Sequence, residues 1–169
     1  LDLLVVKTDK LKEKFAKVAL PMAAELKDFI KENGNHVIGS YTIEQVYSGK
    51  KGMIGVVTET SKLDPEEGIR FRGYSIPELR EKLPKAPGDT EPLPEGIFYL
   101  MLIGEIPTDE EATYVSNQWA RRSNVPKHVF DMLDKLPANT NPMTQFSMAV
   151  MALQTESVFA SAYRKGLSK

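Results

Sequence analysis

Two arginines separated by one residue, Arg70 and Arg72, are side chains that could do recognisable chemistry in this chain. A guanidinium group binds a carboxylate or a phosphate through paired hydrogen bonds, so the two together could hold an anion. Glu66 and Glu67 lie just before them, and surface arginines commonly pair with such neighbouring acids. Two interpretations follow, an anion site and a turn held by local ion pairs, and both remain open at this level.

A second basic candidate is the glycine-rich stretch Gly49-Lys-Lys-Gly-Met-Ile-Gly55. Exposed backbone N–H groups and two ammonium groups in one turn could receive a phosphate. The stretch lacks the G-x-x-x-x-G-K-[ST] spacing of a phosphate-binding P-loop. A solvated turn is therefore the alternative.

Other catalytic and metal-binding chemistry has little support. The only histidines are His36 and His128, and neither has a second histidine or a carboxylate at ligand spacing. The chain contains no cysteine, which excludes thiol nucleophiles and thiolate ligands. No nucleophile elbow, dinucleotide fingerprint or H-E-x-x-H motif occurs. We therefore predict no metal site and no catalytic residue within the chain.

Composition sets broader limits. A chain of 169 residues that is 41% hydrophobic can bury one sizeable core. No apolar run approaches the ~18 residues of a membrane span, so no membrane insertion is expected. The formal net charge is −1, with basic residues scattered along the chain, which disfavours a small nucleic-acid-binding module.

The elements that must position these residues are mostly helical. Apolar spacing predicts an amphipathic helix over 9–33 that Asn33-Gly34 ends, and Pro21 should kink it or start a second helix. Residues 36–42 have the pattern of a short strand, and a second short strand is expected from Ile69 until Gly73 ends it. Residues 97–103 are apolar on nearly all sides, which predicts a deeply buried helix.

Three capping boxes mark helix starts, because a hydroxyl side chain and an acid or amide three residues later satisfy each other's backbone donors. They are Thr42 with Gln45, Ser75 with Glu78, and Thr108 with Glu111. Further helices are expected after Pro126 and from Asn141, the latter interrupted at 154–156. Together these elements predict a mainly α fold with a few short β-strands near its N-terminal third.

Several irregular motifs carry a family resemblance. The run L-D-P-E-E-G-I-R-F-R-G-Y-S-I-P-E at 63–78 resembles a segment of the eukaryotic, mitochondrial type of citrate synthase. P-L-P-E-G at 92–96, G-E-I-P-T at 104–108 and N-P-M-T-Q at 141–145 are similar to that family too, in the same order and spacing. The resemblance covers the chain from about Asn33 onward, and it matches only the N-terminal part of the enzyme.

The resemblance implies a fold and a domain division. The chain would supply part of the multi-helical large domain of citrate synthase. Residues 1–34 would form an N-terminal amphipathic helical segment, and residues 35–169 the N-terminal part of the large domain, without its catalytic part.

The resemblance also implies a function. The family consists of acyltransferases that condense acetyl-CoA with oxaloacetate and water to give citrate and CoA, the first step of the tricarboxylic acid cycle. Its members of this type are homodimers of the mitochondrial matrix, and the import presequence would already be absent here. Acetyl-CoA and CoA are substrate and product rather than tightly bound cofactors. The family's catalytic residues lie beyond the position that matches Lys169, so this chain alone is expected to be inactive.

Two residues are carried over from the resemblance as contacts to the CoA phosphates. Lys51 lies in the glycine-rich turn, where an arginine is usual in animal enzymes, and a lysine keeps the charge but loses paired hydrogen bonding. Lys169 matches a second phosphate-binding arginine. The helix that begins at Asn141 resembles a subunit-interface helix, and its small residues suit close packing across a two-fold axis.

A non-enzymatic alternative remains. The chain could be a citrate-synthase-derived structural subunit of a larger assembly, in which another chain buries the apolar face of 142–163. The mass of the native polypeptide separates the alternatives. A chain of roughly 430 or more residues fits the complete enzyme, as multi-helix size scaling allows, whereas a chain ending near Lys169 fits the structural subunit.

Overall fold

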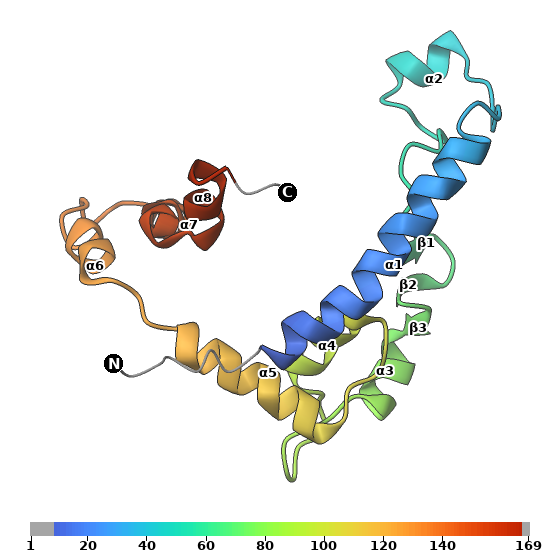
Figure 1. Cartoon of the computed structure of the whole chain (residues 1–169). Helices are drawn as coiled ribbons and strands as arrows, with labels where there is room; N and C mark the ends of the chain where they lie inside the picture. The colour runs from blue at the N-terminus through green and yellow to red at the C-terminus, as the bar shows by residue number, and fades with distance from the viewer. Residues whose placement is uncertain (1–8, 167–169) are drawn as a thin grey trace. The chain divides into compact units, whose positions relative to one another are not determined.

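Helices dominate the computed structural model, which describes residues 9–166 (Figure 1). The described residues form eight α-helices and one 3-10 helix: α1 Lys10–Asn33, α2 Ile43–Tyr47, α3 Ile76–Lys82, α4 Pro94–Ile103, α5 Asp109–Arg122, α6 Lys127–Leu133, α7 Pro142–Ala152, η1 Leu153–Glu156 and α8 Val158–Arg164. They also form one antiparallel sheet of three strands: β1 Ser61–Asp64, β2 Gly68–Phe71 and β3 Tyr74–Ser75. The predicted mainly α class with a few short strands is confirmed.

The chain divides into two compact units. One unit ends at Gln118 and the other begins at Trp119, in the second half of α5. The division predicted from the sequence, between residues 34 and 35, stays a prediction.

Helix α1 begins at a side-chain cap, where Asp9 Oδ1 accepts a hydrogen bond from Leu11 N–H at 3.2 Å. Pro21 lies inside the helix, so the expectation that a second helix would start there is wrong. The ring removes one backbone donor, but hydrogen bonds on either side carry the helix through to Asn33. Leu11 and Val18 pack on the core, whereas the apolar side chains of the C-terminal half, such as Phe29, are exposed.

A hydrogen-bonded turn connects the first two strands of the sheet. Asp64 Oδ1 accepts hydrogen bonds from the backbone N–H groups of Glu66 (2.9 Å) and Glu67 (3.0 Å), and Gly68 adopts a φ of 86°. Strand β1 then pairs with β2 in the register Ser61↔Phe71, and β2 pairs with β3. The expected strand, which begins at Ile69 and is ended by Gly73, corresponds to β2, and a turn then leads into β3.

The expected strand over 36–42 is wrong, because those residues have no regular secondary structure. All of them are exposed, and no strand of the described sheet pairs with them. Apolar alternation favours a strand only where a partner strand and a covered face exist.

The core lies where α1, α3, α4 and α5 meet. Leu100 and Val115 are fully buried, in clusters with Leu79 and Leu83 and with Tyr99 and Ile103 respectively. Each such side chain contributes about 1.5–3 kcal/mol when it leaves water. The predicted deep burial of α4 therefore holds for the face that carries Tyr99, Leu100 and Ile103, whereas Phe98 is exposed; the helix ends at Gly104 with a left-handed φ of 90°.

The second unit is a short helical series. Asn141 Oδ1 caps α7 by accepting from Met143 N–H at 2.9 Å, as predicted, and η1 interrupts the helical segment before α8. Val129 of α6 is buried, but α7 buries none of its residues, and Phe146 and Val150 are more than half exposed. Within residues 9–166, no helix combines the length and the apolar character that crossing a membrane requires.

Candidate functional site

The glycine-rich turn follows directly from α2. Thr42 Oγ1 accepts from Gln45 N–H at 3.2 Å, and Gln45 Oε1 accepts from Thr42 N–H at 3.0 Å, so the predicted capping box is present. The helix lasts only five residues before Ser48 ends it. The glycine-rich turn therefore begins just after a short helix whose first residue is fixed by the capping box.

Left-handed backbone shapes the turn itself. Gly49, Lys50 and Gly52 have φ values of 74°, 64° and 72°. Glycine adopts this region without a Cβ clash, which explains the two glycines, whereas the lysine between them costs about 1 kcal/mol or more. The turn is closed by hydrogen bonds from Lys50 N–H to the carbonyl of Gln45 (2.8 Å) and from Met53 N–H to the carbonyl of Lys50 (3.0 Å).

Lys51 is an exposed residue of this turn. The turn follows α2, which lies beyond the C-terminal end of α1 (Figure 1). Within residues 9–166, no carboxylate forms an ion pair with its ammonium group. Its carbonyl oxygen accepts a hydrogen bond from Gln45 Nε2 at 3.4 Å. The residue therefore offers an uncommitted cation on a backbone that is tied down.

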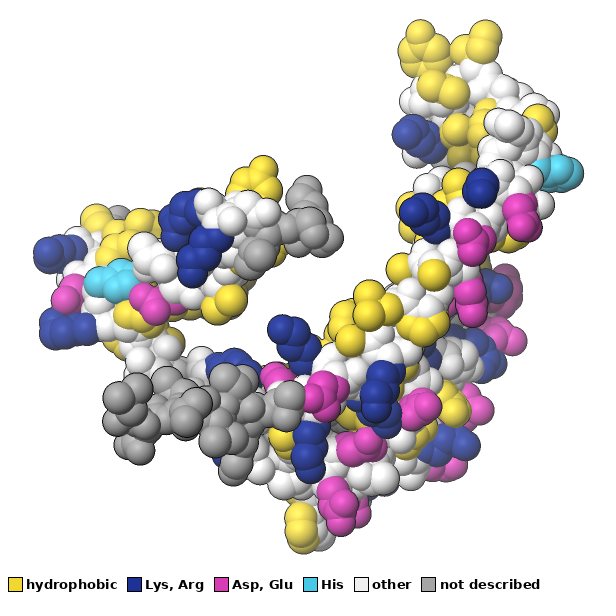
Figure 2. All heavy atoms as spheres, in the orientation of Figure 1, with side chains coloured by type: hydrophobic (Ala, Val, Ile, Leu, Met, Phe, Trp, Pro, Cys, Tyr) yellow, Lys and Arg dark blue, Asp and Glu magenta, His cyan; other side chains and the backbone are white. Residues whose placement is uncertain are grey.

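Exposed apolar residues precede and follow the candidate turn in the chain. Figure 2 shows hydrophobic side chains gathered over α2 and along α1. Ile43, Val46, Tyr47 and Ile54 are all more than half exposed. The turn therefore lies in a part of the chain that exposes several apolar side chains.

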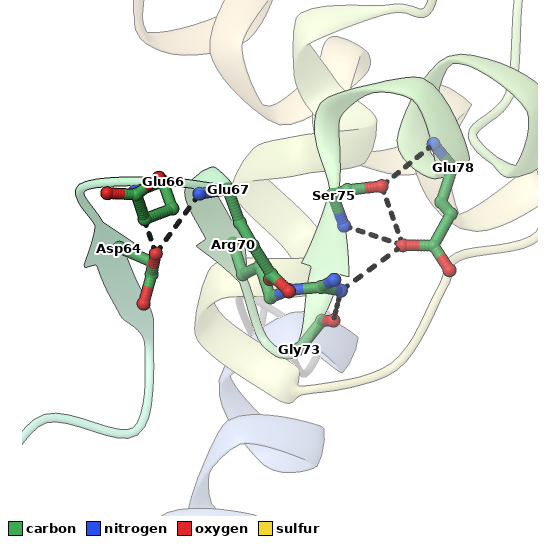
Figure 3. Close-up of polar contacts among 7 residues, drawn as sticks. All are labelled: Asp64, Glu66, Glu67, Arg70, Gly73, Ser75 and Glu78. Carbon is green, nitrogen blue, oxygen red and sulfur yellow. Dashed lines mark hydrogen bonds and ion pairs between the residues drawn. The ribbon is translucent and has the colours of Figure 1, made fainter.

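The other basic candidate has a structural use. Arg70 Nε lies 3.0 Å from Glu67 Oε2, and Arg70 Nη1 lies 3.6 Å from Glu78 Oε2 and donates to the carbonyl of Gly73 at 3.1 Å (Figure 3). Arg72 Nη2 donates to the carbonyl of Met101 at 2.8 Å. Of the two interpretations of this stretch, the structure favours ion pairing over an anion site.

The ion pairs fit the capping of α3. Glu78 accepts from the N–H (2.8 Å) and the hydroxyl (2.7 Å) of Ser75, and these hydrogen bonds lower the pKa of Glu78. Asp64 also has a lowered pKa, because the backbone N–H groups of Glu67 and then Glu66 donate to it. Both acids are thus held ionised by local donors, and this stretch stabilises the fold.

A long-range network at the start of α1 was not foreseen. Lys14 Nζ lies 2.9 Å from Glu111 Oε1 and 3.1 Å from Glu105 Oε2, and the Tyr99 hydroxyl donates to Glu111 Oε1. Burial alone would raise the pKa of Glu111, but hydrogen bonds from Tyr99, Thr108 N–H and Lys14 outweigh it and lower that pKa to about 2. Tyr99 and then Glu111 raise the pKa of Lys14.

This network holds α1 against α4 and α5, and it offers no reactive group. The predicted capping box at 108–111 accounts for the hydrogen bonds between Thr108 and Glu111. The contact of Glu111 with Lys14 joins residues that lie 97 positions apart in the chain. Nothing local in the sequence could have indicated that pair.

The remaining predicted residues do not join a site. His36 is exposed, and His128 Nε2 lies 3.2 Å from the carbonyl of Ala152, which links α6 to the end of α7. In the described part of the chain, no three His, Asp or Glu side chains are placed to hold a metal ion. Lys169 lies outside the described residues, so the structure does not describe it beside Lys51.

Comparison with known families decides what kind of protein carries this turn. Residues 49–166 match the family model described as "Citrate synthase, C-terminal domain". The chain belongs to the citrate synthase family. The matched range begins at the first glycine of the turn and includes the connector at 61–78 and helices α3 to α8.

Curated relatives agree with this assignment. "Citrate synthase, mitochondrial" from Saccharomyces cerevisiae is 55% identical over 94% of this chain and 33% of its own length, and that from Xiphias gladius is 52% identical over 94% and 34%. "2-methylcitrate synthase, mitochondrial" from Yarrowia lipolytica is 50% identical over 95% and 35%. The resemblance carried by the sequence motifs is confirmed, and the chain spans about a third of the length of these citrate synthase relatives.

Proposed function

We propose that this chain is the amino-terminal third of a mitochondrial citrate synthase. The complete enzyme would condense acetyl-CoA with oxaloacetate and water to give citrate and CoA, as a homodimer in the mitochondrial matrix. The observation that carries the proposal is the 55% identity over 94% of the chain to a protein named mitochondrial citrate synthase. The mitochondrial names of the relatives support the location.

Within that enzyme, this part of the chain would bind rather than react. The turn at 49–52 offers an exposed ammonium group, at Lys51, with no carboxylate partner among the described residues. Ammonium groups bind phosphates as point charges, and CoA carries several phosphate groups. Lys51 would therefore attract the CoA phosphates, with Lys169 as a second contact.

The acyl group is the finer question. A relative named 2-methylcitrate synthase is 50% identical, only slightly less than the citrate synthases. A product with one more methyl group requires an acyl donor one carbon longer. A pocket distinguishes substrates that differ by one methylene by about 10- to 200-fold, so the two donors can be separated by rate.

The test is a steady-state assay of the complete protein with oxaloacetate and either acetyl-CoA or propionyl-CoA, in which released CoA thiol is measured. We expect CoA release that requires both substrates and is at least tenfold faster with acetyl-CoA, as a methylene-sized difference in the pocket allows. Residues 1–169 alone should release none. Faster release with propionyl-CoA would replace citrate with 2-methylcitrate as the product.

The structural-subunit alternative is tested on the native protein. A native polypeptide that ends near Lys169 and releases no CoA would overturn the proposed activity. Light scattering of the active protein should give twice the mass of one polypeptide if the enzyme is a homodimer.

A further inference from the structure

Gln45 is the one half-buried residue in an otherwise exposed part of the chain. All other residues from 31 to 50 are exposed. Gln45 also lies between the two features described above, the start of α2 and the glycine-rich turn. A partly covered polar side chain needs hydrogen-bond partners, and the Gln45 amide has them in Thr42 and Lys51.

Besides its backbone N–H, which donates to Thr42 Oγ1 at 3.2 Å, three further groups of Gln45 are used at once. Its Oε1 accepts from Thr42 N–H at 3.0 Å, its backbone carbonyl accepts from Lys50 N–H at 2.8 Å, and its Nε2 donates to the carbonyl of Lys51 at 3.4 Å. The first contact fixes the helix start. The other two fix the turn, on both sides of the peptide bond that joins Lys50 to Lys51.

The turn needs such a tether. Three of its four residues, from Gly49 to Gly52, have left-handed φ values, two of them at glycines, which have more backbone freedom than any other residue. Gln45 Nε2 is the one side-chain group in the described chain that bonds to the backbone of residues 49–52. On the far side, the Tyr41 hydroxyl donates to the carbonyl of Ile54 at 3.2 Å, which braces the segment beyond the turn.

We propose that Gln45 is a positioning residue for acetyl-CoA, because its side-chain amide holds the Lys51 backbone in the conformation that presents the Lys51 ammonium group. The inference rests on the proposed function, in which Lys51 contacts the CoA phosphates. Gln45 does not touch the ligand. It acts by reducing the conformational freedom that Lys51 would otherwise lose on binding.

The expected effect is selective. A net hydrogen bond of this kind corresponds to a factor of about three to five in an equilibrium constant. We therefore expect Gln45→Met to raise the KM for acetyl-CoA about three- to fivefold, with kcat and the KM for oxaloacetate unchanged. Methionine has a similar length and no charge, and it cannot donate to the Lys51 carbonyl.

The matched control separates the turn from the helix cap. Thr42→Val removes the hydroxyl that accepts from Gln45 N–H at 3.2 Å but leaves the Gln45 amide and its bond to Lys51. We expect Thr42→Val to lower the melting temperature about as much as Gln45→Met, while the KM for acetyl-CoA changes less than twofold. Equal KM values in the two variants would overturn the proposal, since the effect would then belong to the cap.

A double-mutant cycle with Lys51→Ala tests the route of the effect. If Gln45 acts through Lys51, Gln45→Met should raise the KM in the parent enzyme and leave it unchanged in Lys51→Ala. The same increase in both backgrounds would overturn the proposal but leave the CoA contact standing. An unchanged KM in Lys51→Ala alone would overturn the CoA contact itself, so the two failures are distinguishable.

Gln45→Glu is a second variant that tests the same proposal if Gln45→Met does not fold. Glutamate preserves the capping box but has no amide donor for the Lys51 carbonyl. Measured at high ionic strength, where the added charge is screened, it should still raise the KM for acetyl-CoA about threefold over the parent enzyme in the same buffer. An unchanged KM would overturn the proposal.

Discussion

The turn at 49–52 and the connector at 61–78 have the same ingredients but use their cations differently. Each combines glycines with left-handed φ, at least two basic residues and a neighbouring capping box. In the connector, Arg70 pairs with two glutamates and Arg72 donates to a backbone carbonyl of α4. In the turn, the Lys51 ammonium group has no such partner among residues 9–166.

The difference shows that basic residues in a glycine-rich stretch do not define an anion site by themselves. A cation that already has carboxylate or carbonyl partners must give them up to bind a ligand, and the cost offsets the gain. A cation without partners loses only water. The arrangement of neighbours, rather than the number of positive charges, therefore separates a binding turn from a structural connector.

The largest effect that would test this comparison is expected at Arg72. Arg72→Met removes the hydrogen bond to the Met101 carbonyl, which lies in a partly buried position. We expect the free energy of unfolding to fall by about 2 kcal/mol, because a charged hydrogen bond is lost and a partly buried carbonyl is left without it. Urea denaturation measures this change, and the KM for acetyl-CoA should stay constant. A raised KM for acetyl-CoA with unchanged stability would mean that Arg72 takes part in ligand binding and not in stabilising the fold.

Lys51 should show the opposite behaviour. Lys51→Ala should raise the KM for acetyl-CoA about tenfold, equivalent to about 1.4 kcal/mol, and leave the urea midpoint unchanged. Lys51→Arg is the matched variant, because it keeps the charge and adds paired hydrogen bonding, and its KM should equal or fall below that of the parent. Loss of stability without a change in KM would make the turn a second structural connector.

The Lys14 network gives a smaller, pH-dependent effect. The pKa of Glu111 is about 2 in the fold and 4.5 as its ordinary value, so the unfolded chain binds more protons between these pH values. The stabilisation is complete above about pH 4.5 and is lost as the pH falls toward 2. Since Glu111 is about a third exposed, solvent screening leaves about 1 kcal/mol.

Urea denaturation of the parent and of Glu111→Gln at a series of pH values measures that loss. The difference between the two should shrink by about 1 kcal/mol as the pH falls through this window. Glu110→Gln is the control, because Glu110 is exposed, and it should show no such change. A constant difference for Glu111→Gln would mean that its hydrogen bonds do not hold the carboxylate ionised.

The smallest effect is expected at Arg70. Its ion pairs with Glu67 and Glu78 are solvent-exposed, and such pairs contribute little to stability. Arg70→Ala should therefore shift the urea midpoint slightly, and less in high salt, with no change in KM. A KM effect comparable to that of Lys51→Ala would break the distinction between the two regions.

The local elements followed from the sequence because their partners lie within a few residues. The capping boxes at 42–45, 75–78 and 108–111 all formed, and Gly104 ends α4 in the left-handed region. In each case a side chain or a glycine satisfies the geometry of its own helix end. The family motifs at 63–78 were equally local, and the resemblance that they carried was confirmed.

The candidate site was foreseen only in part. Lys51 was identified in a glycine-rich turn, and the proposed CoA contact remains a prediction, as does the one at Lys169. Gln45 was recognised as a helix cap, but its bond to the Lys51 carbonyl was not, since it depends on the short α2 letting the chain return toward its own start. An amide six residues before a basic residue was the one signal available.

The sequence by itself determined the helix ends, the turns and the family. The helix ends and turns followed because near neighbours in the chain satisfy the backbone hydrogen-bonding groups there. Tertiary structure alone decided that α1 continues through Pro21, that 36–42 forms no strand, and which cations have partners. Lys14 meets Glu111 across 97 residues, and Arg72 meets Met101 across 29. Such contacts arise from packing between distant elements, which no local pattern records.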